Sequence, residues 1–531
     1  MQNTKQSKFK KFLSRFKIKR LSDLDYLKLT KFKKILYRLK CFFAGILPAL
    51  WRFIKKIGRF FKKLGLKVKD LFVDIFMTFK NGGWKTRISF FIMGFGNLSR
   101  KQIAKGLLFF IFEAVFIFYM IAYGGHWLGM MKTLGEATQY KVYNEALDTY
   151  QLIEGDNSVK ILLYGLLTIL FIVAFIYTWR LNVKQCKLCD EIEAKGKKVK
   201  SNKEDLESLL DDNFHKTLLA LPVVGVIAFT IIPIIYMVIV AFTNYDGAHD
   251  GYSNLFTWVG MQNFNELFSF KDSAGGNLSL AFGEILGWTL IWAIFATFSN
   301  YFLGMFVAIM INKKGIKLKK MWRGILVLTI AVPQFISLMY VSKMFGANGI
   351  VNGFLIKLHI IDENSTINFL NDVDRPNLAR VMVILINIWI GIPYLMLIAT
   401  GVLMNIPQDL YESAMIDGAN VWQQYTRITL PYMLFVTGPY LLTSFIGNIN
   451  NFNVIFLLTG GNPNNPDLLT SGGSAGSTDL LITWLFKITT GATSNYKLAS
   501  VIGIMIFLVV SIISLIVYNL MPSNRNEEDF S

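Results

Sequence analysis

Eight long apolar segments constrain the fold of this chain more than any other feature of its sequence. Each holds about 20 mostly apolar residues, the length of a helix that crosses the roughly 30 Å hydrocarbon core of a bilayer. Only 17% of the 531 residues are charged, against about 25% in an average soluble domain. We therefore expect an all-α polytopic membrane protein. The candidate spans are residues 107–124, 161–178, 218–242, 285–311, 324–344, 381–404, 432–456 and 497–519.

Lysine and arginine residues set the expected orientation, because short loops rich in them stay in the cytoplasm. Loop 179–216 holds nine of these residues and loop 312–323 holds six. Loop 243–284 holds one lysine among five acids, and we expect it outside together with loop 125–160. With eight spans, both termini then lie in the cytoplasm, and so does the connection between spans six and seven.

The first 105 residues carry all the excess positive charge of the chain. They hold 28 lysines and arginines against four aspartates, a net charge of +24, whereas the whole chain has +20. Phe9, Phe12 and Phe16 recur at helical spacing among these cations. We expect a basic amphipathic arm that lies on anionic membrane lipid at the cytoplasmic surface. RNA binding is the alternative, but no RNA-binding motif supports it, and we expect no nucleic-acid partner.

The chain's motifs indicate neither a bound cofactor nor catalysis. Cys186 and Cys189 have the spacing of half a zinc site or of a redox pair, but the sequence holds no second such pair, and the only nearby histidine is His215. Since structural zinc sites use four ligands, we expect reduced thiols in a cytoplasmic loop. The nucleotide-binding pattern G-x-x-x-x-G-K-[ST] is absent from the sequence. We expect no metal and no catalytic residue in this chain.

The connection between spans six and seven, residues 405–431, predicts a compact helix–turn–helix unit in water. Pro407 suits the first turn of a helix. Asp417 and Gly418 end that helix, because glycine tolerates the left-handed cap conformation. A second short helix is expected before Pro431, which opens span seven. The unit either docks on a partner or packs beneath its own bundle, and the pattern alone leaves both open. Its apolar residues at helical spacing are Leu410, Tyr411, Ala414, Met415, Trp422, Tyr425 and Ile428.

Within this unit the sequence resembles the EAA loop of ABC importer permeases. The resemblance lies in Glu-Ser-Ala-x-x-Asp-Gly-Ala at 412–419 and in Ile-x-Leu-Pro at 428–431. The family has alanine where this chain has Ser413. In that family the loop is a coupling helix seated in a cleft of the ATPase subunit, so the resemblance implies docking on an ATPase here. The coupling residues that it implies are Glu412, Ala414, Asp417, Gly418, Ala419 and Tyr425.

Further stretches are similar to the larger permease of maltose/maltodextrin-type sugar importers. These stretches are residues 331–337, 387–394, 448–461 and 478–481. The chain departs from that pattern in its long basic arm and in its short loop 243–284, where some members insert a domain. The resemblance implies a six-helix type I importer core. The expected organisation is the arm 1–105, two additional spans in 106–216, the core 217–521 and a cytoplasmic tail 522–531.

The same resemblance implies a set of partners. They are a second homologous permease, two ATP-binding cassette ATPases that bind ATP and Mg, an external sugar-binding protein, and an oligosaccharide such as maltose or a maltodextrin. The chain itself would bind no cofactor. It would cross the plasma membrane of a bacterium several times, and alternating access would couple sugar uptake to ATP hydrolysis by the partners.

Span seven carries a polar stripe at membrane depth. In a helix, Ser444, Gly447, Asn448 and Asn451 share one face. Amides donate and accept hydrogen bonds, which suits sugar hydroxyls. Such residues also hold membrane helices together, and periodicity alone favours that interpretation. The resemblance instead implies sugar binding, because importers of this kind bind sugar on this face.

The resemblance adds further residues to the expected substrate site. By motif position these are Gln334 in span five and Ile390 with Gly391 in span six. Pro333 and Pro393 are expected to interrupt their helices and to free carbonyl groups for a polar cavity. Gly447 leaves space where a larger side chain could stand, which suggests a roomy pocket.

The same residues bear on three alternative functions. The same machine could take another sugar, a polyol or glycerol phosphate, but a phosphate would want arginine or lysine in the cavity, and spans five to seven have none centrally. A membrane-embedded glycosyltransferase would need clustered acids or histidines, and the four histidines are dispersed. A structural membrane scaffold would have no ATPase partner.

Overall fold

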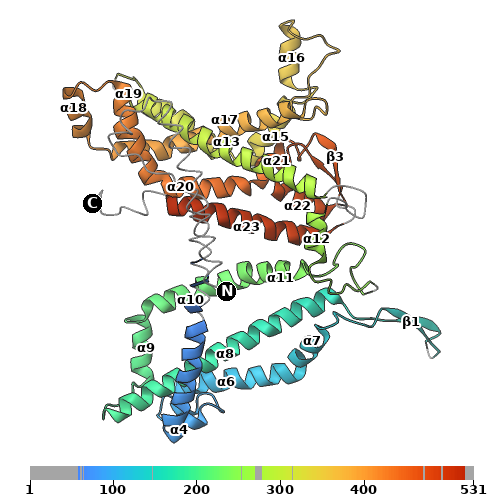
Figure 1. The fold of residues 1–531 in the computed structure, drawn as a ribbon, viewed down its shortest axis with the longest axis vertical. Helices are drawn as coiled ribbons and strands as arrows, with labels where there is room; N and C mark the ends of the chain where they lie inside the picture. Colours follow the sequence, from blue (N-terminus) through green and yellow to red (C-terminus); the bar gives the residue numbers. More distant parts are fainter. Residues whose placement is uncertain are drawn as a thin grey trace, which may run out of the picture. The chain divides into compact units, whose positions relative to one another are not determined.

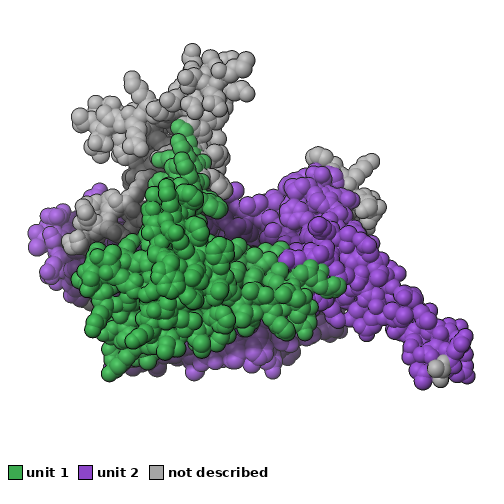
Figure 2. Space-filling model, turned by 90° about the horizontal axis from the view of Figure 1, so that it is seen from below, with its two compact units in different colours: residues 1–126, 167–224 green, residues 127–166, 225–531 purple. Residues whose placement is uncertain are grey.

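The computed structural model describes residues 65–520 apart from 146, 253, 270–277, 314, 471–472 and 492–493, together with residues 55, 58, 59, 62 and 63. Within this part, seven helices are long and apolar enough to cross a membrane, and a bent pair of helices makes a possible eighth. The prediction of an all-α polytopic fold with about eight spans is confirmed. Figure 2 colours the two compact units of the chain, unit 1 (1–126 and 167–224) and unit 2 (127–166 and 225–531).

Unit 1 contains the N-terminal elements and parts of three spanning helices. The greater part of the predicted basic arm, residues 1–54, lies outside the described residues. The first elements are a helix over 65–81, α4 (Trp84–Ile88), α5 (Phe95–Leu98) and α6 (Ile103–Tyr119), which continues through a π-helical turn (Met120–Gly124) into α7 (Gly125–Met130). The remaining elements are α8 (Ser158–Ala194), α9 (Asn202–Leu210) and α10 (Phe214–Val226), and α7, α8 and α10 each extend into unit 2.

Charged groups fix the N-terminal elements of unit 1 to its longer helices. Asp74, on the helix over 65–81, pairs with Arg180 and with Lys187 of α8, the latter at 2.6 Å between Nζ and Oδ1. Glu113 of α6 accepts a hydrogen bond from the backbone N–H of Met93 at 2.7 Å. This carboxylate, which would be costly in lipid, therefore faces protein.

The two cysteines of the C-x-x-C pair are buried in unit 1 as free thiols. The Cys186 thiol lies 3.3 Å from the Ser89 hydroxyl, and the Cys189 thiol lies 3.8 Å from the Gln102 side-chain oxygen. Both lie on α8 and pack against the segment that precedes α6, so the prediction that they lie in a loop is wrong. The described residues contain no group of three or more His, Cys, Asp or Glu side chains that could hold a metal.

Unit 2 is a helical bundle built around α13 (Leu278–Asn312), which packs along α17 (Pro376–Met404) and α20 (Leu430–Ile449) (Figure 1). Small residues bring these helices close together: a Cβ on Gly304 would stand 2.6 Å from the Cβ of Leu395. The other helices of the unit are α11 (Ile232–Val240), preceded by a π-helical turn (Ile227–Ile231), α12 (Gln262–Phe268), α14 (Lys319–Ala331), α15 (Gln334–Met344), α16 (Ile350–Lys357), α18 (Gln408–Ile416), α19 (Val421–Gln424), α21 (Phe452–Leu458), α22 (Leu481–Thr490) and α23 (Tyr496–Leu520).

Two antiparallel hairpins join the helices of unit 2. β1 (Tyr140–Asn144) pairs with β2 (Thr149–Ile153), and β3 (Asn464–Thr470) pairs with β4 (Gly473–Gly476). The second hairpin lies in the glycine- and asparagine-rich stretch after span seven. The buried Asp479 side chain anchors it, because it accepts a hydrogen bond from the Gly476 N–H at 2.7 Å and pairs with Lys487 at 2.6 Å.

Spans five and seven are broken, whereas span six is one continuous helix. Span five is bent by 89° between α14 and α15, where Val332 and Pro333 leave the helical conformation. The prediction that Pro393 interrupts span six is wrong, because Pro393 is buried inside the continuous helix α17. Span seven ends early: α20 stops at Ile449, and a separate helix, α21, begins at Phe452.

Candidate functional site

A cluster of polar side chains surrounds one region of α13, where this helix meets α17 and α20. The Thr297 hydroxyl accepts a hydrogen bond from the Asn448 amide at 3.0 Å. The Asn448 side-chain oxygen in turn accepts from the Asn451 amide at 3.2 Å. One turn further along α13, the Asn300 side chain lies against Gly391 of α17. The fold thus gathers three of the predicted residues, Gly391, Asn448 and Asn451, around a single region of α13. We use the name amide cluster for five residues: Thr297, Asn300, Gly391, Asn448 and Asn451.

The break between α20 and α21 determines how Asn451 joins the amide cluster. Asn451 is the N-cap of α21, and its side-chain oxygen accepts from the Val454 N–H at 3.3 Å. The predicted continuous helical face therefore ends at Asn448, and the extension of that face to Asn451 is wrong. Trp292 of α13 donates its indole N–H to the Asn448 carbonyl at 3.1 Å. The same carbonyl also accepts the backbone N–H of Asn451 at 3.3 Å, so the indole bond attaches the end of α20 to α13.

Two buried amide atoms in this part of unit 2 have no hydrogen-bond partner among the described residues: the side-chain oxygen of Asn300 and the side-chain nitrogen of Asn387. These side chains are only 7% and 6% exposed. Asn387 lies one turn before Gly391 on the same face of α17. A buried polar group without a partner costs about 1–3 kcal/mol, so a hydroxyl or a water that bonds to these atoms would be stabilised.

Thr297, Asn300 and Asn387 were not among the predicted site residues. Thr297 and Asn300 lie close together, with Ser299, in the mostly apolar span four, and Asn387 is the one amide in span six. Their presence is itself a signal, because polar groups at membrane depth are costly unless they have a partner. Asn387 also lies within a stretch that resembles the family, four residues before Gly391. The sequence offers no indication that Thr297 and Asn300 face α20 and α17.

The two glycines of the predicted site have different surroundings. A Cβ on Gly391 would stand 2.4 Å from the Asn300 side-chain nitrogen, so this glycine permits close contact between α13 and α17. No atom lies within 4 Å of the position that a Cβ on Gly447 would take. Gly447 is exposed, so this open space lies at the surface of α20, next to Asn448 in the sequence.

The other predicted substrate residues take different positions. Ser444 is half-buried, one turn before Asn448 on α20. Ile390 is half-buried and packs against the apolar core that contains Trp292. Gln334 is exposed at the first turn of α15, directly after the bend of span five.

The unit at 405–431 projects from the bundle at the end of α17. Figure 1 shows α18 and α19 at one end of unit 2, with α16 and β3 at the opposite end. Gly418 has a φ of 76° and follows the end of α18, which confirms the predicted stop. The predicted separate second helix is wrong: α19 continues through a π-helical turn (Tyr425–Thr429) into α20, so that Val421–Ile449 forms one segment.

One hydrogen bond attaches α18 to this segment, between the hydroxyl groups of Tyr411 and Thr429 at 2.8 Å. Apolar side chains remain exposed around the turn, notably Ile416 at 87% and Trp422 at 69%. A patch of this kind on a polar projecting turn is typical of a protein interface. Of the predicted coupling residues, Glu412, Asp417 and Gly418 are exposed, whereas Ala414, Ala419 and Tyr425 are half-buried.

Comparison with known proteins places these features in a family. The model of the binding-protein-dependent transport system inner membrane component matches residues 300–524, a range that contains every predicted site residue. The maltodextrin transport system permease protein MalC of Streptococcus pneumoniae serotype 4 is 33% identical over 433 residues, which cover 80% of this chain and 93% of that protein.

Two proteins of Bacillus subtilis are similar over most of their length. The maltodextrin transport system permease protein MdxF is 34% identical over 82% of this chain and 95% of that protein. The galactooligosaccharides transport system permease protein GanP is 31% identical over 80% and 94%. With this identity and coverage, the chain belongs to the family of binding-protein-dependent transport permeases, whose members cross the membrane several times.

Proposed function

We propose that this chain is one permease half of an ATP-driven importer of oligosaccharides, with maltodextrins as the first candidate substrates. The observation that carries the proposal is the amide cluster, an amide-rich site between α13, α17 and α20 with open space at Gly447. The substrates named for MalC and MdxF suggest the class of sugar.

The chemistry of the cluster suits a neutral sugar. Hydroxyl groups both donate and accept, and each amide side chain offers a complementary donor and acceptor. The unpaired oxygen of Asn300 and the unpaired nitrogen of Asn387 would bond to such hydroxyls or to a bridging water. Asn448, Asn451 and Ser444 would bind from α20 and from the start of α21. Gln334, Ile390, Gly391 and Gly447 would shape the rest of the pocket.

Transport would be driven by partner subunits, since the chain lacks a nucleotide-binding motif. A second homologous permease would complete the pathway, two ATPases would bind ATP and Mg, and an external sugar-binding protein would deliver the substrate. The exposed face of α18, with Glu412, would be seated on an ATPase. Because α19 continues directly into α20, movement of this unit would be transmitted to the helix that carries Asn448.

The test is transport by the reconstituted importer with a panel of sugars. We expect maltodextrins to stimulate ATP hydrolysis and uptake, and the Asn448→Leu variant to lower sugar uptake about tenfold or more. Asn450→Leu is the matched control, because Asn450 is an exposed amide two residues away and lies outside the cluster. Equal uptake by the two variants would contradict the assignment of the site, and a complex that no sugar stimulates would contradict the proposed function.

Galactooligosaccharides are the second candidate substrate. GanP covers nearly the same part of this chain as the two maltodextrin permeases and has a similar identity. A glucose-based and a galactose-based sugar of equal length should therefore be compared in the same assay. The sugar with the higher kcat/KM for uptake is the substrate.

A further inference from the structure

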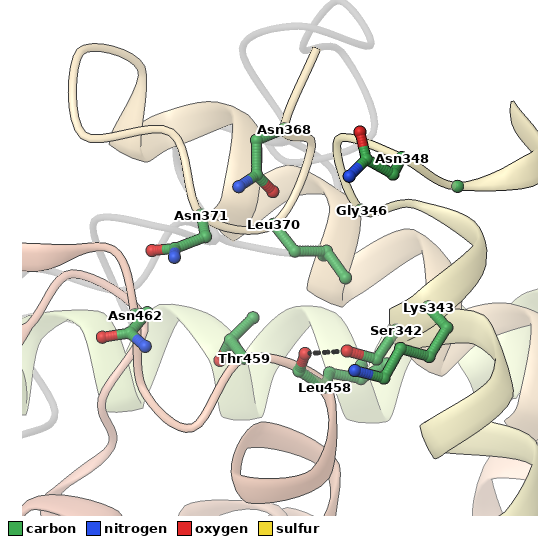
Figure 3. Close-up of a pocket in the computed structure, with 11 residues that line it drawn as sticks. Ser342, Lys343, Gly346, Asn348, Asn368, Leu370, Asn371, Leu458, Thr459 and Asn462 are labelled. Carbon is green, nitrogen blue, oxygen red and sulfur yellow. Dashed lines mark hydrogen bonds between the residues drawn. The ribbon is translucent and has the colours of Figure 1, made fainter. Parts of the chain in front are cut away.

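A polar cavity of about 430 Å³ lies in unit 2 at the end opposite α18 (Figures 1 and 3). Four asparagines from three segments line it: Asn348 from the turn before α16, Asn368 and Asn371 from the loop after α16, and Asn462 from the segment after α21. Ligand pockets typically measure roughly 300–1,000 Å³. The size of this cavity is thus suitable for a small ligand.

The four amide side chains make no hydrogen bond within the described part of the chain, although neighbouring polar groups do. Ser342, for example, donates to the Leu458 carbonyl at 2.7 Å, as the dashed line in Figure 3 marks. The amides therefore present free donors and acceptors around one space. The buried side chains of Leu370 and Leu458 add apolar surface to the lining.

The charges around the cavity favour a neutral ligand. The loop 361–375, which contributes two of the amides, holds four acids and one arginine, so it repels anions. Lys343 also lines the cavity and is exposed, so it disfavours cations while it can donate to a hydroxyl. Amide groups with an apolar lining suit the hydroxyls and the C–H faces of a neutral sugar.

Helix α21 connects this cavity with the amide cluster. Asn451 caps its first turn, and Leu458 at its last turn lines the cavity. Seven helical residues span about 10 Å, which is short enough for one oligosaccharide to reach from one site towards the other. The cavity opens at the end of the unit that the proposed orientation places outside.

We infer that this cavity is an outer subsite that binds the end of an oligosaccharide before the sugar reaches the amide cluster. The inference rests on the proposed function, because it concerns the same transport path. The outer subsite would lower the KM for longer sugars and would matter less for a disaccharide, which is too short to occupy both sites.

The first experiment measures maltotriose binding to the full importer complex by titration calorimetry without the binding protein. In the Asn448→Leu background, which impairs the inner site, we expect residual binding. Adding Asn348→Leu and Asn371→Leu should weaken that binding about tenfold or more. Adding Asn364→Leu should leave it unchanged, because Asn364 is an exposed amide of the same loop that does not line the cavity.

The second experiment keeps the inner site intact. Asn371→Cys is labelled from outside with a membrane-impermeant maleimide, and maltotriose should slow the labelling at least about threefold, whereas labelling of Asn364→Cys should not change. The two other described cysteines, Cys186 and Cys189, are buried. This result is independent of how well the Asn448→Leu variant folds.

Three outcomes would overturn the inference. If maltotriose neither binds in the Asn448→Leu background nor protects Asn371→Cys from labelling, the cavity holds only water. Variants that change affinity for the sugar-binding protein, but not for maltotriose alone, would show a protein contact instead. In both cases uptake by the unchanged complex would leave the proposed function intact. A complex that neither binds nor transports any sugar of the panel would contradict both the inference and the proposed function.

Discussion

At the residue scale, the role of each polar group in the amide cluster depends on whether it has a hydrogen-bond partner. Asn448 has a bonded partner on α13, whereas Asn300 keeps one buried oxygen unpaired. The first arrangement is typical of helix packing and the second of a ligand site. Both occur within two turns of one helix, so the same polar region can hold the bundle together and bind a substrate.

The contact between Gly391 and Asn300 gives a prediction at this scale. Gly391→Ala places a Cβ where the Asn300 amide now lies and displaces that side chain from its 2.8 Å bond to the Ala296 carbonyl. We expect a loss of about 1–3 kcal/mol in unfolding free energy, measured by thermal unfolding in detergent. Asn300→Ala removes the clash, so the double variant should be more stable than the sum of the two single changes implies. Strict additivity would disprove the contact.

At the element scale, the projecting unit is a short helix on a rigid stem. α18 is joined to the segment of α19 and α20 by the turn at Gly418 and by the Tyr411–Thr429 bond. The capping box of Asn420 and Gln423 stabilises the first turn of that segment. On the proposed mechanism, this turn would pass a force on α18 to α20.

The proposed docking of α18 on an ATPase predicts the effect of a charge reversal. Glu412→Lys leaves the bundle unchanged, because Glu412 is exposed, but it should place the wrong charge at the ATPase surface. We expect sugar-stimulated ATP hydrolysis to fall about tenfold or more, or the ATPase to be lost on co-purification. Asp362→Lys, the same charge change on an exposed residue at the opposite end of the unit, is the control. Normal coupling in Glu412→Lys would contradict docking at this face.

A second element-scale feature joins the loop after α11 to the start of α23. The Asp246 carboxylate lies 2.9 Å from the Lys497 ammonium and 2.7 Å from the His249 ring. The backbone N–H of Lys497 also donates to the backbone carbonyl of Tyr245 at 2.9 Å. Burial opposes ionisation of Asp246, but the hydrogen bonds and charges of Lys497 and His249 outweigh it and lower the pKa of this carboxyl.

This shift predicts a pH-dependent contribution to stability. A carboxyl with a lowered pKa in the folded state stabilises the protein at neutral pH, and that contribution is lost as the pH falls through the folded-state pKa. We expect Asp246→Asn to lower the unfolding free energy by about 1 kcal/mol at pH 7. The difference from the unchanged chain should shrink below about pH 4, as measured by thermal unfolding across pH. A difference that grows in acid would contradict the assignment.

At the scale of the whole molecule, the orientation in the membrane decides what each end of unit 2 meets. From the lysine- and arginine-rich loops, we propose that the end with α18 lies in the cytoplasm and the end with α16 lies outside. We expect Asn364→Cys to react with a membrane-impermeant maleimide on intact cells. Glu412→Cys should react only after the membrane is opened. The reverse labelling pattern would exclude docking of α18 on a cytoplasmic ATPase.

Local signals in the sequence predicted a large share of this architecture. The spans follow from hydropathy, because a helix in lipid must be long and apolar. The stop at Gly418 follows from the conformational freedom of one residue. Each of these features depends on neighbours along the chain.

Other features depend on the packed surroundings and could not be predicted in this way. Pro333 is exposed at a sharp bend, whereas Pro393 is buried in a continuous helix. The presence of a proline in each span therefore did not by itself predict a break.

The sequence by itself determined that the chain is a bundle of membrane-spanning helices with a polar projecting turn between spans six and seven. Only the tertiary structure decided that Asn448 meets Thr297, that Asn300 and Asn387 keep unpaired atoms, and that asparagines from three segments line one cavity. The physical reason is range: apolar length and turn chemistry act between residues close in sequence, whereas these contacts form between helices that only folding brings together.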